Sequence, residues 1–476
     1  MNFKSTLLAG TIVGAALIAS PALAQTAPAG GASQAQIDAL AQQIQALQSQ
    51  LTSLKDNVTK EQKAVQKTLA DMPKVTADGG RMRVVTADKK FDVALRARIH
   101  MDYGTWVNKD NYTTDATDGF QLRRAFLGVA GTVYNDWGYE FTGNFANDRG
   151  GASQVQAANI TYNGFKDSQV IMGVFQPKFT LDDSTSSNDI AFMERAPINN
   201  IVVGIGGSDS RTGFGISTKG SNYFLAGYVT GNQTGTTGTI DDMVNLLGRA
   251  AYQFYSSNEG GAGIGLSGVY QVTPQTAART SATQITKTAS FGDRPGVRIG
   301  GNRTSLTSTG TINSIDDQYA YGADLGFNFK SFWGAGEYYK FGASTDERLP
   351  GTTTANSFKD PEFDGYYVSA GYILTGERRA YKPGEWATVK PSWPVGQGGF
   401  GAWEIAARYS TVNLIDRAGG VAGTGTGEEK NWTLGVNWYV NNAIRFMVNY
   451  VNTTVERPNG TEQGLDALAL RMQFQF

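Results

Sequence analysis

The chain has no cysteine, and His100 is the only histidine among its 476 residues. Disulfides and thiolate chemistry are therefore excluded, and so is a metal site that needs several histidines. A catalytic triad could be built only around His100, which lies in the polar row of a predicted strand and is interpreted as a solvated wall residue. We expect no enzymatic activity, no bound metal and no cofactor.

A long apolar run is also missing. A transmembrane helix needs about 18 or more consecutive apolar residues, and no such run follows the first 24 residues. The 59 glycines, 24 phenylalanines and 21 tyrosines fit instead a β-barrel, whose strands hide their apolar face by alternation, or a large secreted β-protein. The net charge of −1 gives no indication of a nucleic-acid partner.

Residues 1–24 are predicted to be a cleavable secretory signal peptide. Lys4 supplies the positive start, residues 7–18 the apolar stretch, and residues 22–24 (Ala-Leu-Ala) the small-residue cleavage site. Residues 25–35 are rich in alanine, glycine and glutamine and are predicted to be a flexible spacer. The chain is therefore expected to be exported.

Residues 36–72 are predicted to form a short α-helical coiled coil, followed by a linker over 73–89. Apolar residues recur there at spacings of three and four, which is the pattern of a coiled-coil seam. They are Ile37, Leu40, Ile44, Leu47, Leu51, Leu54, Val58 and, one repeat further, Val65. The pattern favours self-association over a single helix lying on its own barrel, and it leaves the number of helices open.

From residue 90 to residue 476 the helical period gives way to alternation. The last strand shows it most clearly, with apolar residues at every second position up to the carboxyl terminus: Leu468, Leu470, Met472, Phe474 and Phe476. In a soluble sandwich this row would meet a second sheet, whereas in a barrel it meets lipid. The length predicts an all-β transmembrane barrel of about 16 antiparallel strands.

Alternation also places some basic residues in the lumen. Arg98 lies in the row opposite the apolar Ile99 and should point into water inside the barrel. Arg123 and Arg124 are adjacent, so strict alternation admits only one of them to the lumen. The other would lie at the rim, in a subunit interface or beside a β-bulge.

Three stretches carry a family likeness: FQLRRAFLG at 120–128, GVFQPKFTLDDSTSS at 173–187 with FMER at 192–195, and FGAWEIAARYS at 400–410. Together they resemble the phosphate-selective porin O and P family of bacterial outer-membrane porins, over roughly residues 90–476. The resemblance implies a trimeric, 16-stranded barrel in which a loop around 174–195 folds inward and constricts the pore.

The resemblance also implies which residues line that constriction. By motif position, four arginines match residues that hold anions in the family, and two serines match its loop hydroxyls. These are Arg98, Arg123, Arg124 and Arg195, with Ser186 and Ser187.

One departure from the family concerns charge. Where phosphate-selective members carry a lysine shortly before Thr-Ser-Ser, this chain has Asp183, and Lys178 lies slightly upstream. An acid in a narrow passage turns attraction of anions into repulsion of roughly several kT, which argues against strong phosphate selectivity. The arginines could instead pair with Asp182, Glu140 or Glu194 and brace the loop against the wall.

The sequence therefore predicts a porin of the bacterial outer membrane, a water-filled channel for passive diffusion of small hydrophilic solutes that leans toward small anions, phosphate among them. Two alternatives stay open: a general or weakly cation-preferring porin, and an envelope tether whose pore is incidental. The expected partners are outer-membrane lipid, further copies in a homotrimer, small ions and solutes, and the cell wall through the amino-terminal helix. No nucleic acid is expected.

Overall fold

The computed structural model describes residues 33–78, 81–110, 117–146, 154–234, 243–274, 276–281, 284–299, 305–348, 355–423 and 425–476. The predicted signal peptide and most of the predicted spacer lie outside the described residues. The chain divides into two compact units, one ending at Asp71 and one spanning Met72–Phe476.

The helices are α1 (Gln34–Asp71), α2 (Leu181–Ser184) and α3 (Pro197–Gly206). The strands are β1 (Lys74–Asp78), β2 (Arg81–Val85), β3 (Phe91–Asp110), β4 (Gly119–Val133), β5 (Trp137–Asn144), β6 (Gln154–Phe165), β7 (Ser168–Phe175), β8 (Arg211–Lys219), β9 (Tyr223–Gln233), β10 (Val244–Ser256), β11 (Gly260–Thr273), β12 (Thr276–Ser281), β13 (Gln284–Ala289), β14 (Gly292–Asp293), β15 (Thr307–Ser308), β16 (Ile312–Asn313), β17 (Ile315–Phe329), β18 (Phe332–Thr345), β19 (Glu362–Ile373), β20 (Tyr381–Lys382), β21 (Glu385–Trp386), β22 (Ala402–Asn413), β23 (Glu428–Tyr439), β24 (Ile444–Glu456) and β25 (Glu462–Gln475).

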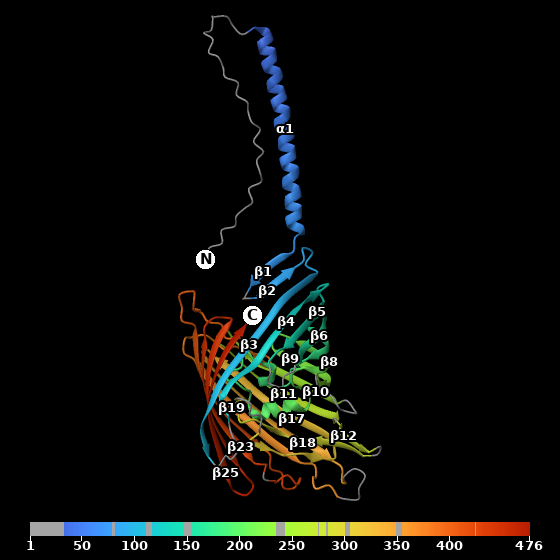
Figure 1. The fold of residues 1–476 in the computed structure, drawn as a ribbon, viewed down its shortest axis with the longest axis vertical. Coiled ribbons are helices and arrows are strands. Elements are labelled where there is room, and N and C mark those ends of the chain that lie inside the picture. The colour runs from blue at the N-terminus through green and yellow to red at the C-terminus, as the bar shows by residue number, and fades with distance from the viewer. Residues whose placement is uncertain are drawn as a thin grey trace. The chain divides into compact units, whose positions relative to one another are not determined.

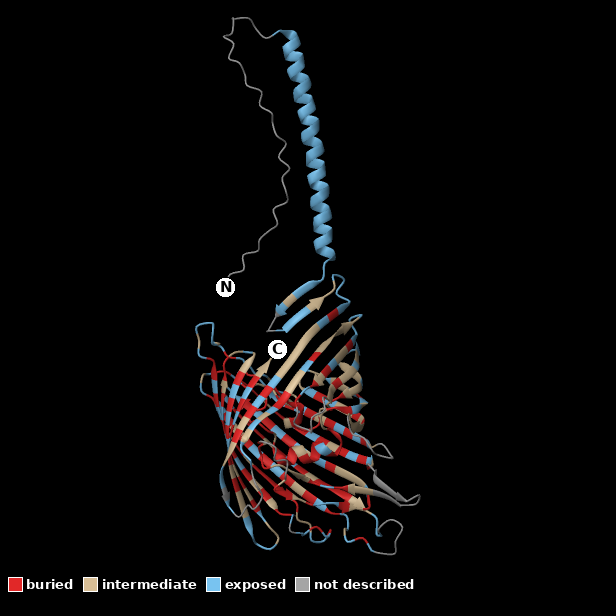
Figure 2. Cartoon of the chain, viewed as in Figure 1, coloured by how far each residue is buried: buried red, intermediate tan, exposed pale blue. Residues whose placement is uncertain are grey.

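Helix α1 is exposed along its whole length (Figure 2). It contains neither glycine nor proline, and it stops just before Pro73, because the residue before a proline resists helical geometry. The seam residues are open to solvent, from 45% for Val58 to 69% for Leu51. An apolar seam of this length favours a covering partner, since leaving it in water forfeits the burial that stabilises most helices.

Sixteen strands close into one antiparallel barrel (Figure 1). One sheet of 18 strands contains the barrel together with the hairpin β1–β2. Each barrel strand pairs with the next one along the chain, and β25 pairs back onto β3, with Phe474 opposite Ile99. The predicted transmembrane barrel of about 16 strands, preceded by a helix, is confirmed.

The polarity of the barrel is the reverse of that of a soluble domain. Along strands such as β10, β23 and β24, buried and exposed residues alternate (Figure 2), and the exposed row is mostly apolar while the buried row carries polar side chains. On β23, for example, Leu434 is 54% exposed, whereas the neighbouring Thr433 is 1% exposed. This arrangement suits hydrocarbon outside and water or polar loops inside. In the described part of the chain, no helix is both long and apolar enough to cross a membrane.

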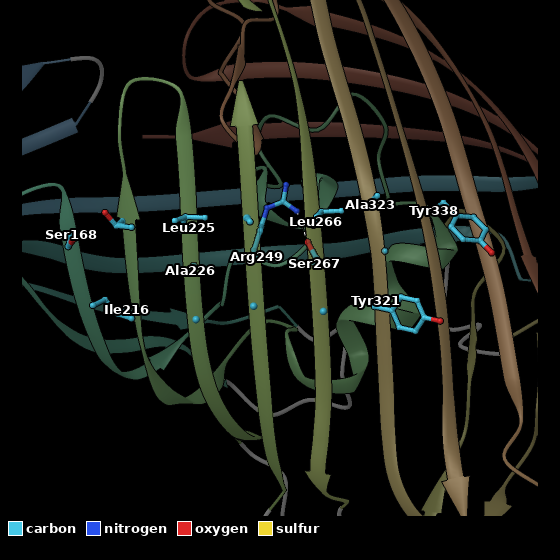
Figure 3. A pocket seen from close by; sticks show the side chains of 16 residues that line it. Ser168, Ile216, Leu225, Ala226, Arg249, Leu266, Ser267, Tyr321, Ala323 and Tyr338 are labelled. Carbon is cyan, nitrogen blue, oxygen red and sulfur yellow. Dashed lines mark hydrogen bonds between the residues drawn. The ribbon is translucent and has the colours of Figure 1, made fainter. Parts of the chain in front are cut away.

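The outer wall also carries a shallow groove of about 890 Å³ (Figure 3). Its floor includes Gly227, Gly248 and Gly268, which lie opposite one another on β9, β10 and β11. Leu225 and Leu266 border it and are exposed. The groove therefore belongs to the lipid-facing wall and not to the lumen.

The two ends of the barrel differ in their connections. Turns at one end are short, such as 166–167 and 330–331, and this is the end that faces the periplasm in outer-membrane barrels. Loops at the other end are longer, such as 176–210 and 274–314. The connection 374–401 is a long one at the short-turn end.

Three of these connections enter the barrel and pack against its inner wall, so the lumen is narrower than a barrel of this size would allow. Phe179 and Ile198 of the loop 176–210 are fully buried in one cluster with Phe341 and Phe363 of the wall. Trp386 of the 374–401 loop packs edge-on against Trp333, 5.6 Å between ring centroids. Ile299 of the 274–314 loop is buried beside Met447.

The inverted polarity predicts how lysine is tolerated on one strand face. Leu434→Lys, at the middle of β23, should cost about 2–4 kcal/mol of the free energy of unfolding, because an ammonium must enter hydrocarbon. Glu428→Lys lies on the same face at the strand end and should cost about 0–1 kcal/mol. Denaturant-driven unfolding from lipid vesicles measures both, and equal costs at the two positions would contradict a lipid-facing wall.

Candidate functional site: the pore constriction

The loop 176–210, called the constriction loop below, is shaped by local signals. Thr180 caps helix α2, since its hydroxyl accepts a hydrogen bond from the Asp183 amide at 3.0 Å. Pro197 begins helix α3 at the position where a missing amide hydrogen costs nothing. The loop thus enters the lumen as two helical segments joined by residues 185–196.

Polar side chains of the wall hold the backbone of this loop. Arg445 and Gln473 both donate to the carbonyl of Asn188, at 3.1 and 3.0 Å. Arg408 donates to the carbonyl of Glu194 at 3.0 Å and stacks over Phe192. Because loop carbonyls inside a barrel cannot all reach water, these donors satisfy groups that would otherwise be buried without a partner.

Arg98 reaches the tip of the constriction loop from strand β3. Its Nη1 donates to Ser187 Oγ at 2.7 Å and its Nη2 to Ser186 Oγ at 3.2 Å. The guanidinium also lies over the Phe126 ring, 5.2 Å from its centroid. In the described part of the chain, no carboxylate lies within ion-pair distance of Arg98. Neutral hydroxyls therefore orient this cation without cancelling its charge.

Arg123 and Arg124 both face the lumen, because a β-bulge interrupts strand β4. His100 pairs with Arg124 and the next residue of β3, Met101, pairs with Leu122, so Arg123 is the extra residue. Arg123 is 7% exposed and Arg124 is 5% exposed. The sequence left three positions open for the second arginine: the rim, a subunit interface or a β-bulge. The structure places it at a β-bulge.

The two adjacent arginines have different partners. Arg123 holds Glu194 with two hydrogen bonds, Nε to Oε1 at 2.8 Å and Nη2 to Oε2 at 3.1 Å. Arg471 donates to the same carboxylate at 3.0 Å, and Arg298 lies 3.4 Å from it. Burial alone would raise the pKa of Glu194, but these arginines outweigh burial and hold its pKa well below the ordinary value. Glu194 is therefore a charged brace between loop and wall.

Arg124 lies against His100 instead, with Nη1 3.4 Å from Nδ1. An arginine can only donate, so Nδ1 accepts and the ring hydrogen sits on Nε2, which is 3.1 Å from Asn188 Oδ1. His100 is fully buried and links the bulge to the loop. The prediction that His100 is a solvated wall residue is therefore wrong.

Arg195 lies within the loop, whereas Asp183 is 6% exposed and borders the cavity between the two loops. Arg195 donates to the carbonyls of Asp182 and Thr185, both at 3.0 Å, and its Nε is 3.6 Å from Asp183 Oδ1. Gln176 donates to the same Oδ1 at 2.7 Å. Burial raises the pKa of Asp183 to about 7, although Arg195 opposes the rise. The acid that departs from the family pattern is thus buried and only partly ionised at neutral pH.

Lys178 and a second lysine come together where the constriction loop faces the 374–401 loop. Lys178 pairs with Glu385, while the exposed Lys382 has no carboxylate within ion-pair distance among the described residues. The 374–401 loop is itself held by Arg379, whose guanidinium forms two hydrogen bonds with Glu404 at 3.0 and 2.9 Å. Sequence reasoning missed Lys382 and Arg379, because their loop shows no regular period and carries no motif.

Three polar cavities meet around these residues. A cavity of about 410 Å³, called the neck below, lies between the two loops. Its border includes the bases Arg98, Lys178 and Lys382, the hydroxyls of Ser186 and Ser187, and the acids Asp183, Asp189 and Glu385. Cavities of about 740 and 800 Å³ adjoin it and share Gln176 with it. The structure thus brings together Arg98, both serines, Lys178 and Asp183 around the neck, and it places Arg123, Arg124 and Arg195 in contacts that support the loop.

A closed barrel with a lipid-facing outer wall and a charged, loop-narrowed lumen defines an outer-membrane channel of the porin class. A family model described as phosphate-selective porin O and P matches residues 93–476, and the chain belongs to this family.

Two relatives match most of the chain, and a solved structure shares the fold. Porin O of Pseudomonas aeruginosa is 27% identical over 424 residues, which cover 84% of this chain and 94% of the relative. An uncharacterized protein of Caulobacter vibrioides is 26% identical over 384 residues, or 78% of this chain and 70% of the relative. The outer membrane channel DcaP of Acinetobacter baumannii shares the fold, with a TM-score of 0.50 and 13% identity over 81% of this chain and 97% of that one.

The raised pKa of Asp183 predicts a pH-dependent selectivity. As pH rises through about 7, Asp183 gains a negative charge beside the neck, so chloride permeability relative to potassium should fall. Zero-current potentials in a KCl gradient from pH 5 to pH 9 measure the change. Asp183→Asn should flatten the profile, and an unchanged slope in that variant would refute the assignment.

Proposed function

We propose that this porin conducts small hydrophilic solutes passively, prefers small anions and catalyses no reaction. The observation that carries the preference is the Arg98 guanidinium, which borders the neck with only neutral hydroxyls as partners. Guanidinium keeps its charge at every physiological pH and offers planar donors to phosphate or carboxylate oxygens. A fixed charge in a narrow, partly dehydrated passage selects ions by its field.

The remaining charges near the neck support this preference. Lys178 and Glu385 cancel each other, Asp183 is paired and partly protonated at neutral pH, and burial raises the pKa of Asp189, the third acid that borders the neck. Lys382 therefore adds a second cation whose charge is not cancelled. The weakly cation-preferring alternative required the acid of the loop to dominate, and its buried position works against that. Arg98 and Lys382, which have no ion-pair partner in the described part of the chain, support a lean toward anions without strong selectivity for phosphate.

Substitution of Arg98 tests the proposal. Arg98→Gln keeps a donor for the serines and removes one charge, which at roughly 8 Å from the ion path and an effective dielectric constant near 40 is worth about 1 kcal/mol, or about a fivefold fall in the chloride-to-potassium permeability ratio. The ratio is measured by zero-current potentials in planar bilayers. Lys340→Gln, at an exposed position paired with Glu362, is the matched control and should change nothing. An unaltered ratio in Arg98→Gln would overturn the anion preference.

We also propose that the porin is a homotrimer. Strands β5 and β7 have only eight residues each. A tilted strand of that length rises about 20 Å, less than the roughly 25 Å apolar band of an outer-membrane barrel. Phe141 on β5 and Met172 on β7 are nevertheless 57% and 69% exposed. Neighbouring copies of the protein would cover this short part of the barrel wall better than lipid.

The exposed seam of α1 supports self-association as well. A trimer would bring three copies of the helix together, and burying their seam residues would stabilise a parallel coiled coil. In a trimer, the α1 helices of the other two copies would cover the apolar seam. Contact with the cell wall would leave these apolar positions uncovered.

Cysteine cross-linking tests the coiled coil in the full chain, which has no cysteine of its own. Leu47→Cys lies in the seam and should form disulfide-linked dimers within a trimer under mild oxidation, since facing seam residues approach closely. Ser49→Cys lies away from the seam on the same turn and should stay unlinked. Non-reducing electrophoresis reads the result, and equal cross-linking of the two variants would argue against a parallel seam.

A further inference from the structure

Glu337, on strand β18, is a buried carboxylate that none of the motifs singled out. It is 2% exposed, and no basic side chain lies within ion-pair distance of it in the described part of the chain. Five donors surround it instead. Oε1 accepts from the amide of Asp182 at 2.8 Å, from Asn199 Nδ2 at 3.0 Å and from Tyr367 Oη at 2.8 Å. Oε2 accepts from the amide of Leu181 at 3.1 Å and from Tyr339 Oη at 3.0 Å.

Three of those donors belong to the constriction loop. The amides of Leu181 and Asp182 are the first-turn amides of α2, which have no partner within the helix. Asn199, on α3, donates both to Glu337 and to Thr180 Oγ1 at 2.8 Å, so one carboxylate ties the two helices of the loop to the same point of the wall.

A second wall contact fixes the residue just before α2. The carbonyl of Phe179 accepts from Arg249 Nη1 at 2.8 Å and from Ser267 Oγ. Figure 3 shows Arg249 and Ser267 on the neighbouring strands β10 and β11, where they also bond to each other at 2.8 Å. The carbonyl of residue 179 and the amides of residues 181 and 182 are therefore all held by side chains of β10, β11 and β18, which lie among four consecutive strands of the wall, β10, β11, β17 and β18.

The path from this anchor to the neck is short. Helix α2 ends at Ser184, and the Thr185 amide and hydroxyl both bond to the carbonyl of Leu181, at 3.2 and 2.9 Å. Thr185 Oγ1 in turn accepts from the amide of Trp386 at 3.1 Å, which joins the second loop to the first. The next two residues are the serines that orient Arg98. No unsupported segment separates Glu337 from those hydroxyls, so a displacement of α2 reaches them directly.

From these contacts we infer that Glu337 is a positioning residue of the pore: it sets the place of the constriction loop and, through Ser186 and Ser187, the orientation of Arg98. The inference rests on the proposed role of Arg98 in anion preference. A carboxylate suits this position because both of its oxygens must accept. A glutamine would turn one of them into a donor that faces a backbone amide, which cannot rotate away as a tyrosine hydroxyl can.

Glu337→Gln in the full-length porin tests the inference by two readouts in planar bilayers. Open-channel current noise reports the mobility of the loop, and the chloride-to-potassium permeability ratio reports the Arg98 site. We expect the noise to increase and the ratio to move at least half of the way to that of Arg98→Gln. In an Arg98→Gln background, Glu337→Gln should leave the ratio unchanged, because both substitutions act on one site.

The matched control is Glu429→Gln. Glu429 is also a buried wall glutamate, 1% exposed on β23, but it accepts its hydrogen bond from Asn431 Nδ2, at 2.9 Å, on the same strand and not in the constriction loop. It should give the noise and the ratio of the original channel. Where Glu337→Gln does not assemble, Asn199→Ala removes one loop-side donor without altering any wall strand and should raise the noise in the same direction.

The outcomes separate the two proposals. A quiet channel in Glu337→Gln, or in Asn199→Ala where that variant replaces it, overturns the positioning role. A ratio that stays constant in Arg98→Gln overturns the anion preference, and a noisy Glu337→Gln channel would still support the anchor in that case. A ratio that falls further in the double variant than in Arg98→Gln alone shows that Glu337 acts by another route and also overturns the inference as stated.

Discussion

The outer face of this barrel must be covered by hydrocarbon, and the rest of the structure follows from that constraint. Lipid accepts no hydrogen bonds, so polar side chains in the middle of the wall have to point inward, and those on the outer face lie near the strand ends. The inner face of the wall therefore carries many hydrogen-bond donors and acceptors, such as Arg249, Glu337 and Arg445. Loops that enter the lumen find partners for their backbone groups there. The same side chains that cannot face lipid therefore build the constriction.

Much of this architecture could be predicted, because it repeats along the chain. Alternation gave the barrel and an approximate strand number, and the spacing of Leu47, Leu51 and Leu54 gave the helix. The direction of Arg123 could not be predicted, since it depends on a single extra residue opposite the step from His100 to Met101. A bulge leaves no mark in the period of one strand. It is visible only when two strands are paired. The alternation of a single strand therefore cannot predict which way the residues beside a bulge point.

In the candidate site, too, motifs in the sequence indicate some residues, whereas other contacts depend on the folded structure. Arg98, Ser186, Ser187, Lys178 and Asp183, which were named from the sequence, border one cavity. The sequence could not show that Arg195 turns back to cap loop carbonyls, because a motif records residue identity and not side-chain direction. Lys382 joins the site from about 200 residues further along the chain, in a loop at the opposite end of the barrel. Only the closed fold brings it near.

Charge in the sequence and charge in the pore are consequently different quantities. Near the constriction, acids are about as numerous as bases, which by composition alone suggests a neutral passage. Their effect on a passing ion depends on what each one contacts. The charge of Glu194 is neutralised by three guanidinium groups, whereas Arg98 is oriented by hydroxyls that do not neutralise its charge. Selectivity therefore resides in the pairing, and an anchor such as Glu337, which never meets an ion, can influence it by deciding which groups stay paired.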